Sequence, residues 1–136
     1  MIPEYNLRAE LEQRLRFETL IADLSSKFVN LPASEVDREI EDAQRRVCEC
    51  VGIDLCALWQ WTNETPRYIT ITHLYRPLGG PPPPERIDGE DMAPWCLGQL
   101  SAGKIVAVAS VESLPPEAAR DQEVWRRYGV KSALNF

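Results

Sequence analysis

The sequence has no long apolar run, a single histidine and no excess of basic residues. Its longest apolar run, residues 105–109, has the length of a strand, whereas a membrane-spanning helix needs about 20 residues. Lys and Arg number 15 against 21 Asp and Glu, so the formal net charge is −6. Binding to nucleic acid or to an anionic membrane needs clustered basic charge. We therefore expect neither nucleic acid nor a membrane as a partner.

Targeting signals are also missing from the start of the chain. Residues 1–8 lead directly into a charged helical pattern, without the apolar segment and cleavage site of a signal peptide. We therefore expect a cytoplasmic protein, in which Cys48, Cys50, Cys56 and Cys96 are free thiols. The 136 residues, 44% of them hydrophobic and 26% charged, have the size and composition of one globular domain.

The first third of the chain has the apolar periodicity of two amphipathic helices, together covering residues 5–51. Pro32 should end the first helix. Ser34, with Asp37 three residues later, should cap the second, and Gly52 should end it. The expected buried stripes consist of Leu11, Leu15, Leu20, Ile21, Leu24 and Phe28 in the first helix, and of Val36, Ile40, Ala43, Val47 and Val51 in the second.

After residue 53 the pattern changes to short strands. Residues 55–61 and 67–75 are rich in β-branched and aromatic side chains and predict a hairpin with its turn at residues 62–66. Alternation along the second strand places Ile69, Ile71, His73 and Tyr75 on one face, which we expect to look inward. Residues 77–90 contain four consecutive prolines and predict a long surface loop.

The last third should contain two helices and two strands. Asp91 should cap a short helix that ends at Gly103. Residues 105–111 are apolar on both faces and predict a strand between covered surfaces. A further helix should end at Gly129, and residues 130–136 begin a strand. Because the chain stops within this strand pattern, we expect it to be a fragment of a longer protein.

This order of elements resembles a GAF domain, particularly the GAF domains of bacterial sensor histidine kinases and related two-component signalling proteins. The resemblance implies an α+β fold related to PAS domains, in which helices flank an antiparallel sheet. It covers residues 1–136 as a single domain that lacks the last strand and the C-terminal helix of the family. The most similar stretches are residues 17–25 (FETLIADLS), 52–54 (GID), 94–95 (PW), 112–118 (ESLPPEA) and 129–132 (GVKS).

The resemblance implies a sensory function, in which a small molecule binds and biases a linked output domain. In this family the ligand commonly lies between the sheet and a covering segment, which corresponds here to residues 77–103. Aromatic walls with few polar groups suit a small-molecule ligand, although the same side chains could simply fill the core. The matching positions are Trp59, His73 and Tyr75 of the hairpin, and Trp95, Cys96 and Gln99 of the short helix.

Other chemistry is not favoured by the sequence, and the cofactor stays unknown. A lone histidine such as His73 is more typical of a hydrogen-bonded core residue than of a haem ligand. The cysteine spacing does not match a structural zinc site. No phosphate-binding loop, nucleophile elbow or zinc-protease motif occurs, so we expect no catalytic activity. A thiol-based redox enzyme is the third alternative, and it would need an activated cysteine.

The second alternative is a dimerisation module without a ligand. Leu7, Leu11 and Leu15 extend the apolar stripe upstream of what a core needs, as in signalling helices that pair with a second subunit. A solvated, frayed terminus would show the same pattern. We accordingly expect a homodimer, formed either through the N-terminal helix of residues 1–31 or through an open sheet edge.

Overall fold

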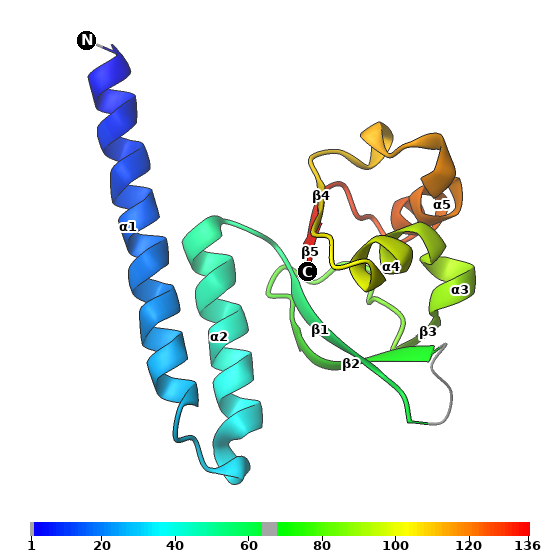
Figure 1. Ribbon diagram of the computed structural model, residues 1–136, viewed down its shortest axis with the longest axis horizontal. Helices are drawn as coiled ribbons and strands as arrows, with labels where there is room; N and C mark the ends of the chain where they lie inside the picture. Colours follow the sequence, from blue (N-terminus) through cyan, green and yellow to red (C-terminus); the bar gives the residue numbers. More distant parts are fainter. Residues whose placement is uncertain (1, 64–67) are drawn as a thin grey trace. The chain divides into compact units, whose positions relative to one another are not determined.

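The computed structural model describes residues 2–63 and 68–136, with side chains from residue 6 onward. The described residues belong to two compact units. One unit contains those up to Leu58 together with Thr72–Leu78, and the other contains those of 59–71 together with Gly79–Phe136. The elements are helices, a three-stranded antiparallel sheet and a separate two-stranded sheet (Figure 1). The predicted α+β class is therefore confirmed, but the strands form two sheets where one was expected.

The first unit begins with a hairpin of two helices (Figure 1). Helix α1 spans Ile2–Phe28 and ends before Pro32, as predicted, and α2 spans Val36–Val51. Ser34 does not cap α2, because it lies inside a 3-10 turn, Ala33–Glu35, that runs directly into the helix. The backbone at Glu35 is already helical, so the chain has no extended residue at which a capping box could form.

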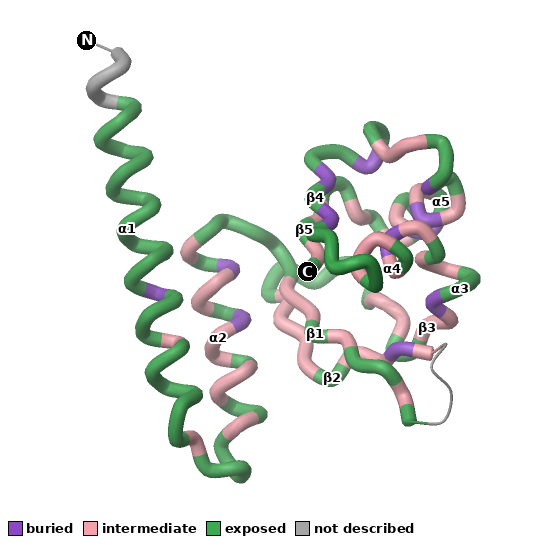
Figure 2. The backbone as a smooth tube through the Cα atoms, viewed as in Figure 1, coloured by how far each residue is buried: buried purple, intermediate pink, exposed green. Residues whose placement is uncertain are grey.

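The predicted apolar stripes of these helices are only partly buried. Leu20 of α1 is buried, whereas most of α1 is exposed (Figure 2). In α2 the buried residues are Gln44 and Cys48, and Val51 is exposed. Hydrogen bonds attach one side of α2 to β2, and ion pairs attach another side to α1. The other residues of the predicted α2 stripe are only half-buried: Val36, Ile40, Ala43 and Val47.

The predicted hairpin is present as β1, Cys56–Trp61, and β2, Tyr68–Tyr75. Part of its predicted turn, residues 64–66, lies outside the described residues. A third strand, β3 (Arg86–Asp88), pairs antiparallel with β2, with Ile69 opposite Ile87. The predicted loop of residues 77–90 therefore contains a strand, which three residues are too few to reveal by alternation.

The second unit carries its helices and strands in the predicted order. They are α3 (Gly89–Met92), α4 (Pro94–Ser101), β4 (Val106–Val108), two 3-10 turns (Val111–Ser113 and Pro116–Ala118), α5 (Ala119–Arg127) and β5 (Ala133–Asn135). The prediction that Asp91 caps the short helix is wrong, because this segment forms two helices. Asp88 caps α3 by accepting the backbone N–H groups of Glu90 and Asp91. Gly129, with φ of +74°, follows α5 as expected.

The core of the second unit is formed by residues of β4 and α4. Cys96, Val106 and Val108 are buried, and Trp95 and Trp125 pack against them. Strand β4 pairs antiparallel with β5. Ile105, just before β4, is 68% exposed, so the prediction that residues 105–111 are covered on both faces is wrong. The reason is that α4 packs on one face of a sheet of only two strands.

Candidate functional site

The six predicted ligand-binding residues are divided between the two units. His73 and Tyr75 belong to the first, and Trp59, Trp95, Cys96 and Gln99 belong to the second. Cys96 is buried in the core, and Trp95 packs beside it, so both side chains contribute to packing. None of the six lines either of the two hollows on the helical hairpin that are described below. As a ligand-binding set they stay a prediction.

His73 lies at the centre of a hydrogen-bond network that joins α2 to β2. Its Nε2 lies 3.0 Å from Asp37 Oδ1, and its Nδ1 lies 3.0 Å from Thr72 Oγ1. Its backbone carbonyl accepts a 3.0 Å hydrogen bond from Gln44 Nε2. A hydroxyl, an imidazole and a carboxylate in series can move a proton, but Thr72 Oγ1 also donates to Leu58 O at 3.4 Å. Because the Thr72 hydroxyl and both nitrogens of His73 already have hydrogen-bond partners, the network serves to link α2 to β2.

The environment of the thiols argues against the thiol-enzyme alternative. Burial, with a smaller contribution from Asp121, raises the pKa of Cys96 to about 11. Burial also raises the pKa of Cys48 and of Cys56 above that of a free cysteine. Because the thiolate is the nucleophile, these three side chains are mostly protonated and weakly reactive near neutral pH.

Asp121 is a structural residue that sequence reasoning missed. It lies on α5 with no exposed surface, and its two carboxylate oxygens accept the backbone N–H groups of Trp95 (3.1 Å) and Cys96 (2.9 Å). These N–H groups belong to the first turn of α4, so Asp121 caps that helix from another element. The sequence contains only indirect evidence for this cap. The residue before Pro94 is an alanine, whose side chain cannot accept a hydrogen bond, so the N–H groups of α4 need an acceptor from elsewhere.

Helix α1 carries a row of exposed apolar side chains. Leu7, Leu11 and Leu15 are 57%, 58% and 64% exposed, and we refer to these three residues as the leucine face. Their spacing of four residues places them on one side of the helix. Phe17 and Ile21 are also exposed, but they lie on another side of α1. A contiguous apolar patch is more typical of an association site than of ordinary solvated surface.

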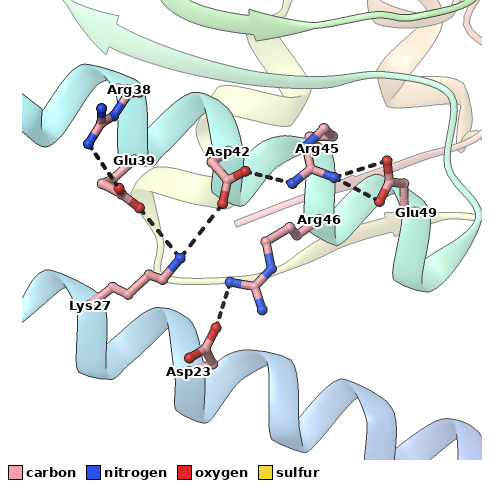
Figure 3. Close-up of polar contacts among 8 residues, drawn as sticks. All are labelled: Asp23, Lys27, Arg38, Glu39, Asp42, Arg45, Arg46 and Glu49. Atoms are coloured by element: carbon pink, nitrogen blue, oxygen red, sulfur yellow. Dashed lines mark hydrogen bonds and ion pairs between the residues drawn. The ribbon is translucent and has the colours of Figure 1, made fainter.

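Ion pairs fix how α1 lies against α2 (Figure 3). Asp23 pairs with Arg46 at 2.6 Å, and Lys27 lies between Glu39 (3.9 Å) and Asp42 (4.0 Å). Such pairs contribute little energy individually, but they show which side of α1 meets α2. At 3.6 residues per turn, the leucine face lies on roughly the opposite side of α1 from Lys27. The packing of the helical hairpin therefore leaves it uncovered.

A hydrogen bond within α2 involves Asp42, one of the carboxylates that lie near Lys27 of α1. Arg45 donates to Asp42 at 2.6 Å and also contacts Glu49 (Figure 3). The hydrogen bond from Arg45 is the main cause that holds the pKa of Asp42 below its usual range, with Lys27 and Arg46 adding to it. The carboxylate is therefore charged at neutral pH, and it supports the attachment of α2 to α1.

Two open hollows run along the helical hairpin. One, of about 360 Å³, is lined by Glu10, Gln13, Arg14, Phe17 and Val51. The other, of about 470 Å³, is lined by Leu15, Arg16, Thr19, Leu20, Asp23 and Arg46. Both combine apolar side chains with charges of both signs and open widely to solvent. They resemble the grooves that receive side chains of a packed helix more than an enclosed small-molecule pocket.

Metal and membrane features are absent from the part of the chain that the structure describes. Within residues 2–63 and 68–136, no group of three His, Cys, Asp or Glu side chains could hold a metal ion. No helix of these segments is both long and apolar enough to cross a membrane.

Comparison with known proteins leaves the family open. No protein-family model matches the sequence, and no curated protein matches it. The resemblance to GAF domains stays a prediction from the residues quoted above.

Proposed function

We propose that this chain is an association module, in which the α1–α2 hairpin pairs with the same hairpin of a second copy. The observation that carries this proposal is the leucine face. Single exposed leucines are common on protein surfaces, but here three follow one another on one side of a 27-residue helix. Burying them against a second helix would remove this apolar surface from water.

The charge of α1 favours a second copy as the partner. The helix carries four basic residues (Arg8, Arg14, Arg16 and Lys27) and five acidic ones (Glu4, Glu10, Glu12, Glu18 and Asp23), a net charge of 4 − 5 = −1. The whole chain has a net charge of −6. A two-fold interface brings the same patch together twice, so the patch must be self-complementary. A nearly neutral helix with interspersed signs meets that requirement, whereas a strongly charged surface would repel its copy.

We place association ahead of ligand sensing for a structural reason. The helical hairpin presents an apolar surface with the two hollows described above beside it, and neither hollow is lined by the predicted ligand-binding residues. In a GAF-like signalling protein, such a hairpin would join two subunits and transmit a change from one domain to the next. The sensory role and the GAF-like architecture are supported by the sequence resemblance alone.

The proposal is tested by measuring mass in solution by light scattering over a wide range of concentrations. The wild-type chain should reach twice its 15.5 kDa mass. Leu11→Glu with Leu15→Glu should give a monomer. Assuming about 1 kcal/mol for each of the four leucines lost from a dimer, the dissociation constant should rise roughly 1,000-fold.

The matched control adds the same charge elsewhere on α1. Asn6→Glu with Ala9→Glu also introduces two carboxylates on exposed positions, away from the leucine face and from both hollows. This variant should keep the dimer. A monomeric wild-type chain, or a dimer that persists in the leucine variant, would overturn the proposal.

A further inference from the structure

Four consecutive prolines occupy residues 81–84 of the second unit, just before β3. Pro81 and Pro82 are exposed, and Pro83 and Pro84 are half-buried. None of the four belongs to a helix or a strand. The association proposed above uses none of them, so this proline run is a separate feature of the surface.

The proline run can adopt only one kind of backbone conformation. Each proline ring fixes φ at about −65°, and each residue that precedes a proline is restricted to extended backbone angles. The peptide bonds of the run are trans. Residues 81–83 are prolines that also precede prolines, so they form a polyproline II helix with about three residues per turn.

Hydrogen bonds hold the chain directly after the run. Glu85 O accepts the N–H group of Ile71 at 3.1 Å, and Arg86 lies opposite Thr70 in the pairing of β2 with β3. The Arg86 guanidinium also lies over the Tyr68 ring, 4.1 Å from its centroid. The proline run is thus joined to a hydrogen-bonded sheet, and a partner would meet it already ordered.

The chain just before the run turns through open space. Gly79 and Gly80 have φ of +69° and +97°, in the left-handed region that favours glycine. A methyl group placed on either glycine would meet no atom within 4 Å beyond its neighbours in the chain. The exposed end of the proline run is therefore open to a partner.

The chemistry of the run selects the class of partner. Proline has no N–H group, so the run cannot pair as a strand with a partner's sheet. It carries no charge, so it offers nothing to a partner that recognises charge. It presents apolar rings and carbonyl oxygens, and no group of the described residues donates a hydrogen bond to these carbonyls. Aromatic side chains can pack on such rings, while a Trp N–H or Tyr O–H donates to a carbonyl beside them.

We propose that residues 81–84 are a docking site for a protein domain of the SH3, WW or EVH1 type, which binds polyproline II segments in a groove lined with aromatic side chains. Pro81 and Pro84 have the P-x-x-P spacing of such ligands, and about three residues per turn places them on one edge of the helix. Pro82 lies on the next edge and is exposed together with Pro81. Because the run is already ordered, binding loses little conformational entropy.

The experiment titrates a panel of isotope-labelled SH3, WW and EVH1 domains with the unlabelled full chain and follows the backbone amide signals of each domain by NMR. We expect at least one domain to bind saturably, with a dissociation constant below about 1 mM. Its largest shifts should lie at its aromatic groove. Absence of binding by every domain would overturn the proposal, and it is the result expected of a run that serves only as a rigid connection.

Variants locate the binding on the proline run. Pro81→Ala with Pro82→Ala removes the two exposed rings and should raise the dissociation constant by about tenfold or more. Because both positions are exposed, this variant should keep the wild-type circular dichroism spectrum. The matched control, Pro32→Ala with Pro77→Ala, removes two exposed prolines outside the run and should bind like the wild-type chain. Unchanged binding by the first variant, or an equal loss in both, would overturn the proposal.

Discussion

The clearest test of how the second unit is held together is to remove the carboxylate of Asp121. This side chain has no exposed surface, and it accepts the first two N–H groups of α4 from a position on α5. Asp121→Ala would leave both N–H groups buried without these acceptors. It would also remove a negative charge from the positive end of the helix.

The expected loss follows from the two hydrogen bonds. A hydrogen bond to a charged group contributes about 1.5–3 kcal/mol, and a buried donor that loses its acceptor costs about 1–3 kcal/mol. Burial also costs the carboxylate its own hydration, which offsets part of these contributions. We therefore expect Asp121→Ala to lower the free energy of unfolding by about 3 kcal/mol. Asp121→Asn keeps one acceptor oxygen, so its loss should be about 1 kcal/mol.

The assay is urea unfolding followed by tryptophan fluorescence, because Trp95 and Trp125 pack around the core of this unit. The matched control is Glu123→Ala, two residues further along α5. The Glu123 side chain is 61% exposed and pairs with Arg120 and Arg127, so its loss should cost less than about 1 kcal/mol. If Asp121→Ala unfolds within about 0.5 kcal/mol of the wild-type chain, the capping argument is wrong.

Two further predictions concern titratable groups. Because the pKa of Cys96 is about 11 and its thiol is buried, iodoacetamide at neutral pH should modify Cys96 more slowly than Cys50, as followed by peptide mass spectrometry; rapid modification in the folded chain would contradict this. A hydrogen bond from Arg126 is the main cause that lowers the pKa of Glu112 in the folded chain. A lowered pKa contributes stability above about pH 4 that is lost as the pH falls further. In the Glu112→Gln variant, the urea midpoint should therefore fall less steeply than in the wild-type chain as the pH is lowered. An equally steep fall in the two proteins would refute this.

Local signals in the sequence predicted where the first two helices end and where the hairpin lies. Pro32 ends the first helical region because its ring excludes a helical predecessor, and Gly52 ends α2 because it adopts the left-handed conformation with little strain. Alternating β-branched and aromatic residues were enough to place β1 and β2. Each of these features depends on residues within a few positions of one another, so a single sequence contains the information.

Prediction from the sequence missed the features that depend on contacts between residues far apart in the chain. Asp121 looks like any surface carboxylate of an amphipathic helix until α4 places two N–H groups against it. Strand β3 exists because β2 offers a pairing edge to three residues with no pattern of their own. Burial of Gln44 and Cys48 depends on which side of α2 meets the sheet. Periodicity identifies an apolar side of a helix but does not say what will cover it.

The sequence by itself determined the α+β class, the order of the elements other than β3 and α3, and the ends of α1, α2 and α5. It also supplied the leucines at 7, 11 and 15, because four-residue spacing places them together on any helix. Only the tertiary structure decided that the packing of α1 against α2 leaves this leucine face exposed, and that Asp121 accepts two N–H groups of α4. The physical reason is that hydrogen bonding along the chain acts locally, whereas burial is set by the partner against which each surface packs.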